Sequence, residues 1–187
     1  MIPAISPRRL FVDGLVLSAL FSIVVLGSVG LNPAIWLDDY PPDVRAAIGD
    51  SMPQPRALQI VIGALLVLVI IGGLIWSLCR LDSELGGIGF GSASLHTFLI
   101  FWIINTADVV VVDWLFFMIL FRNWVVLPGT EGLAGYDDYF FHFKGSFLSL
   151  APWAGSFVLS VVAGAGWWWL VARRRQRERA GALSRTT

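Results

Sequence analysis

Two aspartates five residues apart are the residues of this chain best placed to do chemistry. Asp108 and Asp113 stand in NTADVVVVDWLFF, residues 105–117, where most other side chains are apolar. A carboxylate is costly to bury among apolar groups, so such a residue usually pairs with a cation, carries a proton or faces a wet cavity. The stretch therefore predicts a binding site for a small ligand, an ion or a proton.

Asn105 belongs to the same polar face. At 100° per residue on an α-helix, Asp108 lies about 60° from Asn105 on one side and Asp113 about 80° on the other. One broad face of this helix is therefore polar and is expected to point into a helix bundle. A simpler interpretation stays open, in which Asn105 and Asp108 form a hydrogen-bonded knot that only fixes helix packing.

The following segment, LPGTEGLAGYDDYFFHFKGSF, supplies the nearest basic side chains. Its aromatic residues recur at helical spacing from Tyr136 onward, which predicts a short amphipathic helix at the membrane interface. We expect His142 or Lys144 to approach Asp113 and complete the ligand- or proton-binding site. His142 suits proton handling because the unperturbed pKa of histidine is about 6.5. The alternative is that this helix serves only as an interfacial anchor.

Acid–base catalysis is a second functional interpretation. Asp113, Glu131 and His142 are the catalytic candidates, for a reaction on a lipid or isoprenoid at the outer leaflet. No nucleophile motif or phosphate-binding loop accompanies them, so whether the chain is an enzyme stays open. With two histidines and one cysteine, the sequence predicts no metal site and no cofactor.

The elements that must position these residues are membrane-spanning helices. The chain of 187 residues is 57% hydrophobic and 14% charged, against roughly 45–50% and 25% in soluble domains. Each of its four apolar blocks is long enough for a span of about 20 residues. The blocks cover residues 10–31, 58–79, 95–121 and 151–172. We therefore predict an all-α fold, a four-transmembrane-helix bundle with a short amphipathic interfacial helix in the third connection, as one integral membrane domain over residues 1–187.

Lysine and arginine are distributed unevenly between the two sides of this bundle. One side would hold Arg8, Arg9, Arg80, Arg173, Arg174, Arg175, Arg177, Arg179 and Arg185, and the other Arg45, Arg56, Arg122 and Lys144. Because cytoplasmic flanks are enriched in basic residues, both termini are predicted to be cytoplasmic, in the inner (plasma) membrane. Residues 173–187 would form a basic cytoplasmic tail. His96, near the cytoplasmic end of the third span, is expected at the interface.

The acidic helix and the segment after it also carry a resemblance. NTADVVVVDWLFF followed by VVLPGTEGLAGYDDYFFHFKG resembles a family of uncharacterised small bacterial multi-pass membrane proteins. That family shares an Asp-x4-Asp-Trp-Leu helix, a Pro-Gly-Thr-Glu-Gly loop and a His-Phe-Lys-Gly segment. The resemblance covers about residues 95–147. It implies a bacterial membrane protein and implies no particular activity.

Composition also narrows the partners. The formal net charge is zero, so nothing draws the chain as a whole to nucleic acid, and the lipid bilayer is the expected surrounding. Four helices make a small bundle, so a homo-oligomer or a membrane partner protein is a further expectation. Three functions stay open: an embedded acidic site for a small ligand, ion or proton, which we favour; a membrane enzyme; and an accessory subunit of a membrane complex.

Overall fold

The structure is a computed structural model that describes the backbone of residues 5–183 and the side chains of residues 5–173. It is 84% helical and has no strand among the described residues. Four helices are long and apolar enough to cross a membrane. They are α1 (Pro7–Leu31), α3 (Arg56–Leu85), the continuous helix of α4 (Phe90–Ala107) and η2 (Asp108–Leu120), and α7 (Leu150–Leu183). The predicted all-α fold with four transmembrane helices is confirmed.

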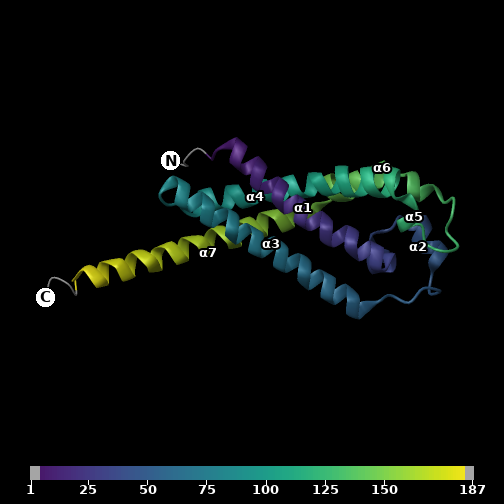
Figure 1. The fold of residues 1–187 in the computed structure, drawn as a ribbon, viewed down its shortest axis with the longest axis horizontal. Helices are drawn as coiled ribbons and strands as arrows, with labels where there is room; N and C mark the ends of the chain where they lie inside the picture. Colours follow the sequence, from purple (N-terminus) through teal and green to yellow (C-terminus); the bar gives the residue numbers. More distant parts are fainter. Residues whose placement is uncertain (1–4, 184–187) are drawn as a thin grey trace.

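The bundle has two unlike ends. At one of them, which we call the terminal end, α1 begins, α3 turns into α4 and α7 ends (Figure 1). Short helices gather at the opposite loop end: η1 (Pro33–Asp39), α2 (Pro42–Ile48), α5 (Arg122–Val125), η3 (Ala134–Asp137), α6 (Tyr139–Phe143) and η4 (Lys144–Leu148). The short helix expected in the third connection is therefore α6, with η3 before it and η4 after it.

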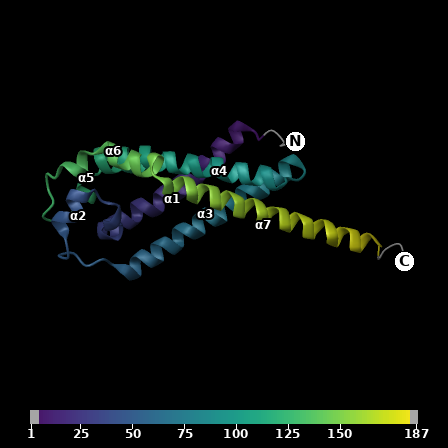
Figure 2. The same cartoon turned by 180° about the vertical axis from the view of Figure 1, so that it is seen from behind.

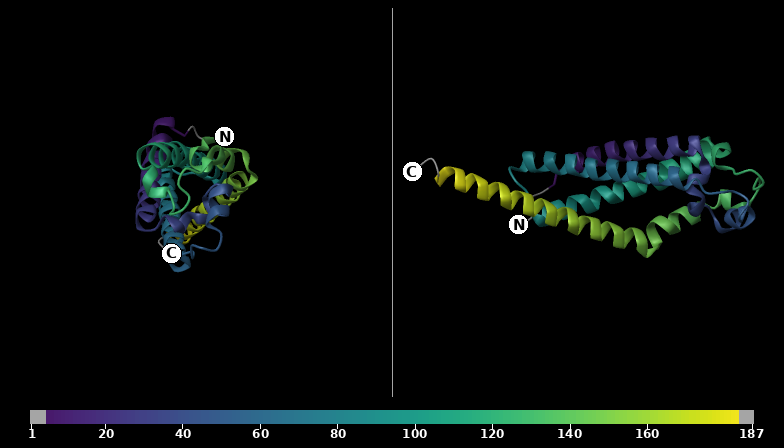
Figure 3. Two further views of the ribbon diagram at one scale, coloured as in Figure 1. Left: turned by 90° about the vertical axis from the view of Figure 1, so that its right-hand side faces the viewer. Right: turned by 90° about the horizontal axis from the view of Figure 1, so that it is seen from below.

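The α4 helix is the centre of the bundle, because it packs along both α1 and α7. The α3 helix lies against α1 but diverges from it towards the loop end, as Figures 1 and 2 show. The α7 helix continues beyond the other helices at the terminal end (Figure 3). Midway along the bundle, Leu17, Leu74, Ile100 and Ile104 form a buried apolar layer.

Several helices extend beyond the predicted apolar spans. The second connection between spans is short because α3 reaches Leu85 and α4 begins at Phe90, whereas the predicted spans ended at 79 and began at 95. Hydropathy marks only the length that can lie in lipid, and a helix can continue with polar residues outside it. The predicted tail of residues 173–187 begins as a continuation of α7 to Leu183, and residues 184–187 lie outside the described part of the chain.

A packed cap closes the loop end. Its buried core consists of Leu37, Tyr40, Val44, Ile48, Leu127 and Tyr136. The Tyr40 hydroxyl donates a hydrogen bond to the Val125 carbonyl at 2.8 Å, and the Leu127 amide donates one to the Tyr136 hydroxyl at 3.1 Å. The first of these bonds ties the first connection to the third, and the second folds the third connection on itself. The cap therefore holds η1 and α6 in fixed positions above the membrane-spanning helices.

Candidate functional site

A cavity of about 440 Å³ lies at the loop end, between α1, η1, η2 and the α6–η4 segment. Its ionisable lining residues are Asp38, Asp39, Asp108, Asp113 and His142. The aromatic part of its wall is made of Phe21, Trp36, Tyr40, Phe117, Tyr136 and Phe141. Its volume falls in the range of roughly 300–1,000 Å³ typical of small-molecule sites, which combine apolar walls with a few polar groups.

The backbone of η2 brings both membrane-embedded aspartates to this cavity. This segment is a π-helix, in which each amide bonds to the carbonyl five residues earlier. The amide of Phe121, for example, donates to the Phe116 carbonyl at 2.7 Å. Asp108 and Asp113 are five residues apart and so lie one above the other, whereas on an α-helix they would be about 140° apart. The π-helical backbone therefore places Asp108 and Asp113 closer together around the helix than the predicted polar face did.

His142 is the basic partner of Asp113. Its Nδ1 atom lies 3.2 Å from Asp113 Oδ2, and both side chains are mostly buried. Burial by itself favours the neutral imidazole. The hydrogen bond to Asp113 and the nearby charges of Asp113 and Asp108 outweigh it, so the pKa of His142 is raised above its ordinary value of 6.5. The protonated form of His142 is thereby favoured beside Asp113.

Asp108 differs from Asp113 in having no such partner. It is the first residue of η2, close to the middle of the helix from Phe90 to Leu120. No described side chain donates a hydrogen bond to its carboxyl group or forms an ion pair with it. Asp108 therefore lines the cavity with a carboxyl group that makes no direct pair with a described side chain.

Two further carboxylates, which the sequence analysis did not identify, line the cavity from η1. The Asp38 carboxylate accepts a hydrogen bond from Gln54 Nε2 at 3.1 Å. Burial, followed by the neighbouring negative charges of Asp38 and Asp113, raises the pKa of Asp39 above its ordinary value of 3.8. The only signal in the sequence is the acidic pair in the first connection. The proximity of Asp39 to Asp113 depends on the fold of the cap.

The remaining predicted site residues lie outside the cavity lining. Asn105 donates a hydrogen bond from Nδ2 to the Ser146 carbonyl at 3.3 Å, which ties α4 to η4. Lys144 is exposed, because it lies two positions beyond His142, which on a helix turns its side chain by about 200°. Glu131 is also exposed and accepts a hydrogen bond from the Gly129 amide at 3.1 Å. The structure therefore brings together Asp108, Asp113 and His142, and leaves Asn105, Lys144 and Glu131 apart from them.

The donor set at the cavity does not suit a metal ion. Within the described residues, no group of three or more His, Cys, Asp or Glu side chains is arranged to hold one. A tightly bound metal needs several such ligands converging at roughly 2.0–2.6 Å. The carboxylates of this cavity are instead spread along its walls.

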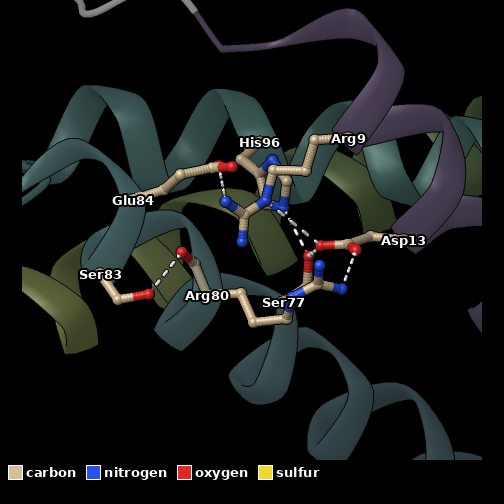
Figure 4. A network of polar contacts seen from close by, with 7 residues as sticks. All are labelled: Arg9, Asp13, Ser77, Arg80, Ser83, Glu84 and His96. Atoms are coloured by element: carbon tan, nitrogen blue, oxygen red, sulfur yellow. Dashed lines mark hydrogen bonds and ion pairs between the residues drawn. The ribbon is translucent and has the colours of Figure 1, made fainter.

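A second polar cluster lies at the terminal end and joins α1, α3 and α4 (Figure 4). Asp13 is completely buried and accepts hydrogen bonds from Ser77 Oγ and Arg80 Nη1, each at 2.7 Å. Arg9 is also buried, lies 3.6 Å from Asp13 and forms an ion pair with Glu84. The sequence analysis did not identify Asp13, although the Arg9–Asp13 spacing of one helical turn was a readable signal.

His96 is the one member of this cluster for which the sequence-based expectation is wrong. It was expected at the membrane interface but is fully buried, with Nε2 2.7 Å from Ser77 Oγ. Because Ser77 gives its one proton to Asp13, the His96 ring must donate to Ser77. A nucleophilic serine needs the opposite arrangement, in which the histidine accepts its proton. The cluster is therefore a structural tie and not a hydrolytic triad.

Comparisons with known proteins add no further assignment. No protein-family model, no curated protein and no solved structure matches this chain.

Proposed function

We propose that this chain is a multi-pass membrane protein that binds a small cation in the loop-end cavity. Asp108 and Asp113 supply negative charge at the membrane-embedded part of the site, and Asp38 and Asp39 supply it at the cap. His142 holds Asp113 in place and adjusts the charge of the site with pH. The binding event is the function; the chain need not catalyse a reaction to perform it.

The observation that carries this proposal is the imbalance of charge around the cavity. Four aspartates line it, and His142 is the only basic side chain among the lining residues. Arg45 acts on Asp39 only from outside the lining, Arg122 is engaged by Asp137, and Lys144 is exposed. Asp38 and Asp39 are exposed, whereas Asp108 and Asp113 are partly buried and lose hydration; neighbouring carboxylates also repel one another. A cation, or protons taken up in its absence, would relieve both costs.

The membrane setting of the site follows from the distribution of arginine and lysine. We place the loop end at the outer face of a bacterial inner membrane and the arginine-rich terminal end in the cytoplasm. The cavity would then take its cation from the outer side. The family resemblance of residues 95–147 is kept as part of the same proposal, because those residues supply both Asp108 and Asp113.

Carboxyl labelling in lipid nanodiscs tests the proposal. A hydrophobic carbodiimide reacts with protonated carboxyl groups in apolar surroundings, and mass spectrometry of peptides can locate the adduct. We expect labelling of Asp108, and slower labelling when at least one of the cations Na⁺, methylammonium and phenethylammonium is added. The Asp108→Asn variant should lose this adduct.

The matched control is Asp50→Asn, which removes an exposed carboxylate of the first connection and should leave the labelling of Asp108 and its protection unchanged. The proposal would be overturned if no cation altered the labelling of either Asp108 or Asp113 at any pH.

A further inference from the structure

We infer that the cation bound in the loop-end cavity is a small organic ammonium with an apolar body, and that Asp108 is the carboxylate that pairs with it. This inference rests on the proposed function and names the class of ligand for the same site. Three features of the cavity support it independently: its volume, its aromatic wall and the unequal pairing of its two membrane-embedded aspartates.

The volume is too large for a bare ion. A water molecule occupies about 30 Å³ of liquid, so a cavity of about 440 Å³ has room for a molecule with many non-hydrogen atoms. A monovalent or divalent ion would contact only one part of such a space. The described residues also offer no converging group of three or more metal-ligating side chains. A larger ligand that carries one charge fits this space better.

The wall of the cavity suits an apolar body next to a positive charge. Phe21 and Phe117 line it from the membrane-spanning helices, and Trp36 and Tyr40 line it from η1. Aromatic faces attract ammonium groups through their quadrupoles, by about 0.5–1 kcal/mol at exposed sites and about 2 kcal/mol or more when desolvated. The same rings also shield the carbon atoms of a ligand from water. Such walls would add little to the binding of a proton.

The two embedded aspartates are not equivalent, and this fixes where the ammonium group binds. Asp113 already has a partner, because His142 Nδ1 lies 3.2 Å from its carboxylate. Asp108, one π-helical turn deeper, has no described partner. An ammonium group is a donor with no acceptor capacity, which matches a carboxylate whose oxygens are free. The charged end of the ligand therefore binds at Asp108, and its apolar body extends towards the cap.

Isothermal titration calorimetry on the full chain in nanodiscs tests this assignment with three probes. Phenethylammonium carries a positive charge and an aromatic body. Its neutral counterpart of similar shape is 2-phenylethanol, and Na⁺ carries charge alone. We expect saturable binding of phenethylammonium, at least tenfold weaker binding of 2-phenylethanol, and no competition by Na⁺. Asp108→Asn should weaken phenethylammonium about tenfold or more, and should leave 2-phenylethanol unchanged.

An aromatic variant tests the wall separately. Phe117→Leu keeps an apolar side chain but removes the ring, and is expected to weaken phenethylammonium about two- to fivefold. Phe140→Leu is the matched control, because Phe140 is exposed and does not line the cavity. It should leave the affinity unchanged.

The possible failures are distinguishable. Binding or protection by Na⁺ or protons without binding of phenethylammonium would overturn the organic-ammonium assignment and leave the proposed cation site standing. Equal binding of phenethylammonium and 2-phenylethanol would also overturn the assignment, since charge would then contribute nothing. If no probe binds and no cation protects Asp108 from labelling, the proposed function fails as well. The wild-type competition series decides these cases even if Asp108→Asn does not fold.

Discussion

At the scale of single residues, the pairing of His142 with Asp113 distinguishes this site from a simple acidic patch. The contact joins α6 of the cap to η2 of the membrane-spanning helix, so it is both a charge pair and a tie between two elements. Because the pKa of His142 is raised above 6.5, the folded protein binds the proton of His142 more tightly than the unfolded chain does. The stability of the cap must therefore depend on pH.

We predict that thermal stability in detergent is higher at about pH 6 than at about pH 8. A group with a raised folded-state pKa stabilises the fold fully below its unfolded value, about 6.5 for histidine, and this contribution is lost as pH rises through the folded value. His142→Gln and Asp113→Asn should each reduce the dependence in this window. An unchanged pH profile in His142→Gln would show that the pair does not stabilise the cap.

At the scale of the elements, the sequence predicts the helices well and the cavity poorly. Lipid requires long apolar helices, so the four spans could be read from composition alone. The π-helical backbone could not, because four consecutive valines between Asp108 and Asp113 carry no periodicity that would distinguish one helix type from another. Asp39 was missed because its approach to Asp113 depends on the cap, which joins segments far apart in the chain. His142 was found because its type and its closeness in sequence to the acidic helix both suggested the contact.

Helix packing gives a prediction that is independent of the site. A Cβ atom at Gly164 on α7 would lie 2.9 Å from the Phe90 backbone carbonyl oxygen and would also meet Ser94 Oγ. Gly164→Ala is therefore expected to push α7 away from α4 and to lower stability by about 1–3 kcal/mol, as overpacking usually does.

Gly166→Ala, two residues later, is the control for this packing prediction. A Cβ atom at Gly166 meets nothing within 4 Å, and alanine is the better helix former. Unfolding in mixed detergent micelles should therefore rank the proteins Gly166→Ala, wild type, Gly164→Ala in order of decreasing stability. Equal stability of the two variants would mean that α4 and α7 are not closely packed at this point.

At the scale of the whole molecule, the two polar clusters divide the bundle between them. The loop-end cavity has space and a carboxylate that no described side chain pairs with, while the terminal-end cluster around Asp13 is buried and bonds one helix to another. The apolar layer of Leu17, Leu74, Ile100 and Ile104 separates them. This arrangement gives the molecule one end that can accept a ligand and one end that holds three helices together.

The terminal-end cluster should be more sensitive than the loop-end cavity to the loss of a charged group. Asp13→Asn leaves the buried Arg9 guanidinium without its nearest carboxylate on α1 and weakens the bond from Arg80. Breaking a buried pair by removing one partner costs about 3–5 kcal/mol, so we predict a loss of that order in the free energy of unfolding. Cation binding by protein that remains folded should be unchanged. A stability loss no greater than that of Asp50→Asn would contradict the structural role of the cluster.

The orientation of the molecule is a separate prediction. A reporter fused after Thr187 should behave as cytoplasmic, and one inserted in the exposed 131–132 turn of the third connection should behave as external. Reporter activity in the opposite sense would place the acidic cavity on the cytoplasmic face and reverse the side from which the cation enters.

The central claim is that the loop-end cavity holds a small organic cation at Asp108. It is tested most directly by determining an experimental structure with 4-bromophenethylammonium, whose bromine can be located by anomalous scattering. We predict bromine density within the aromatic wall of the cavity and the ammonium group within hydrogen-bonding distance of the Asp108 carboxylate. The account would be contradicted if the cavity contained no ligand density at a saturating concentration of the probe, or if the ammonium group lay against a different carboxylate with Asp108 unoccupied.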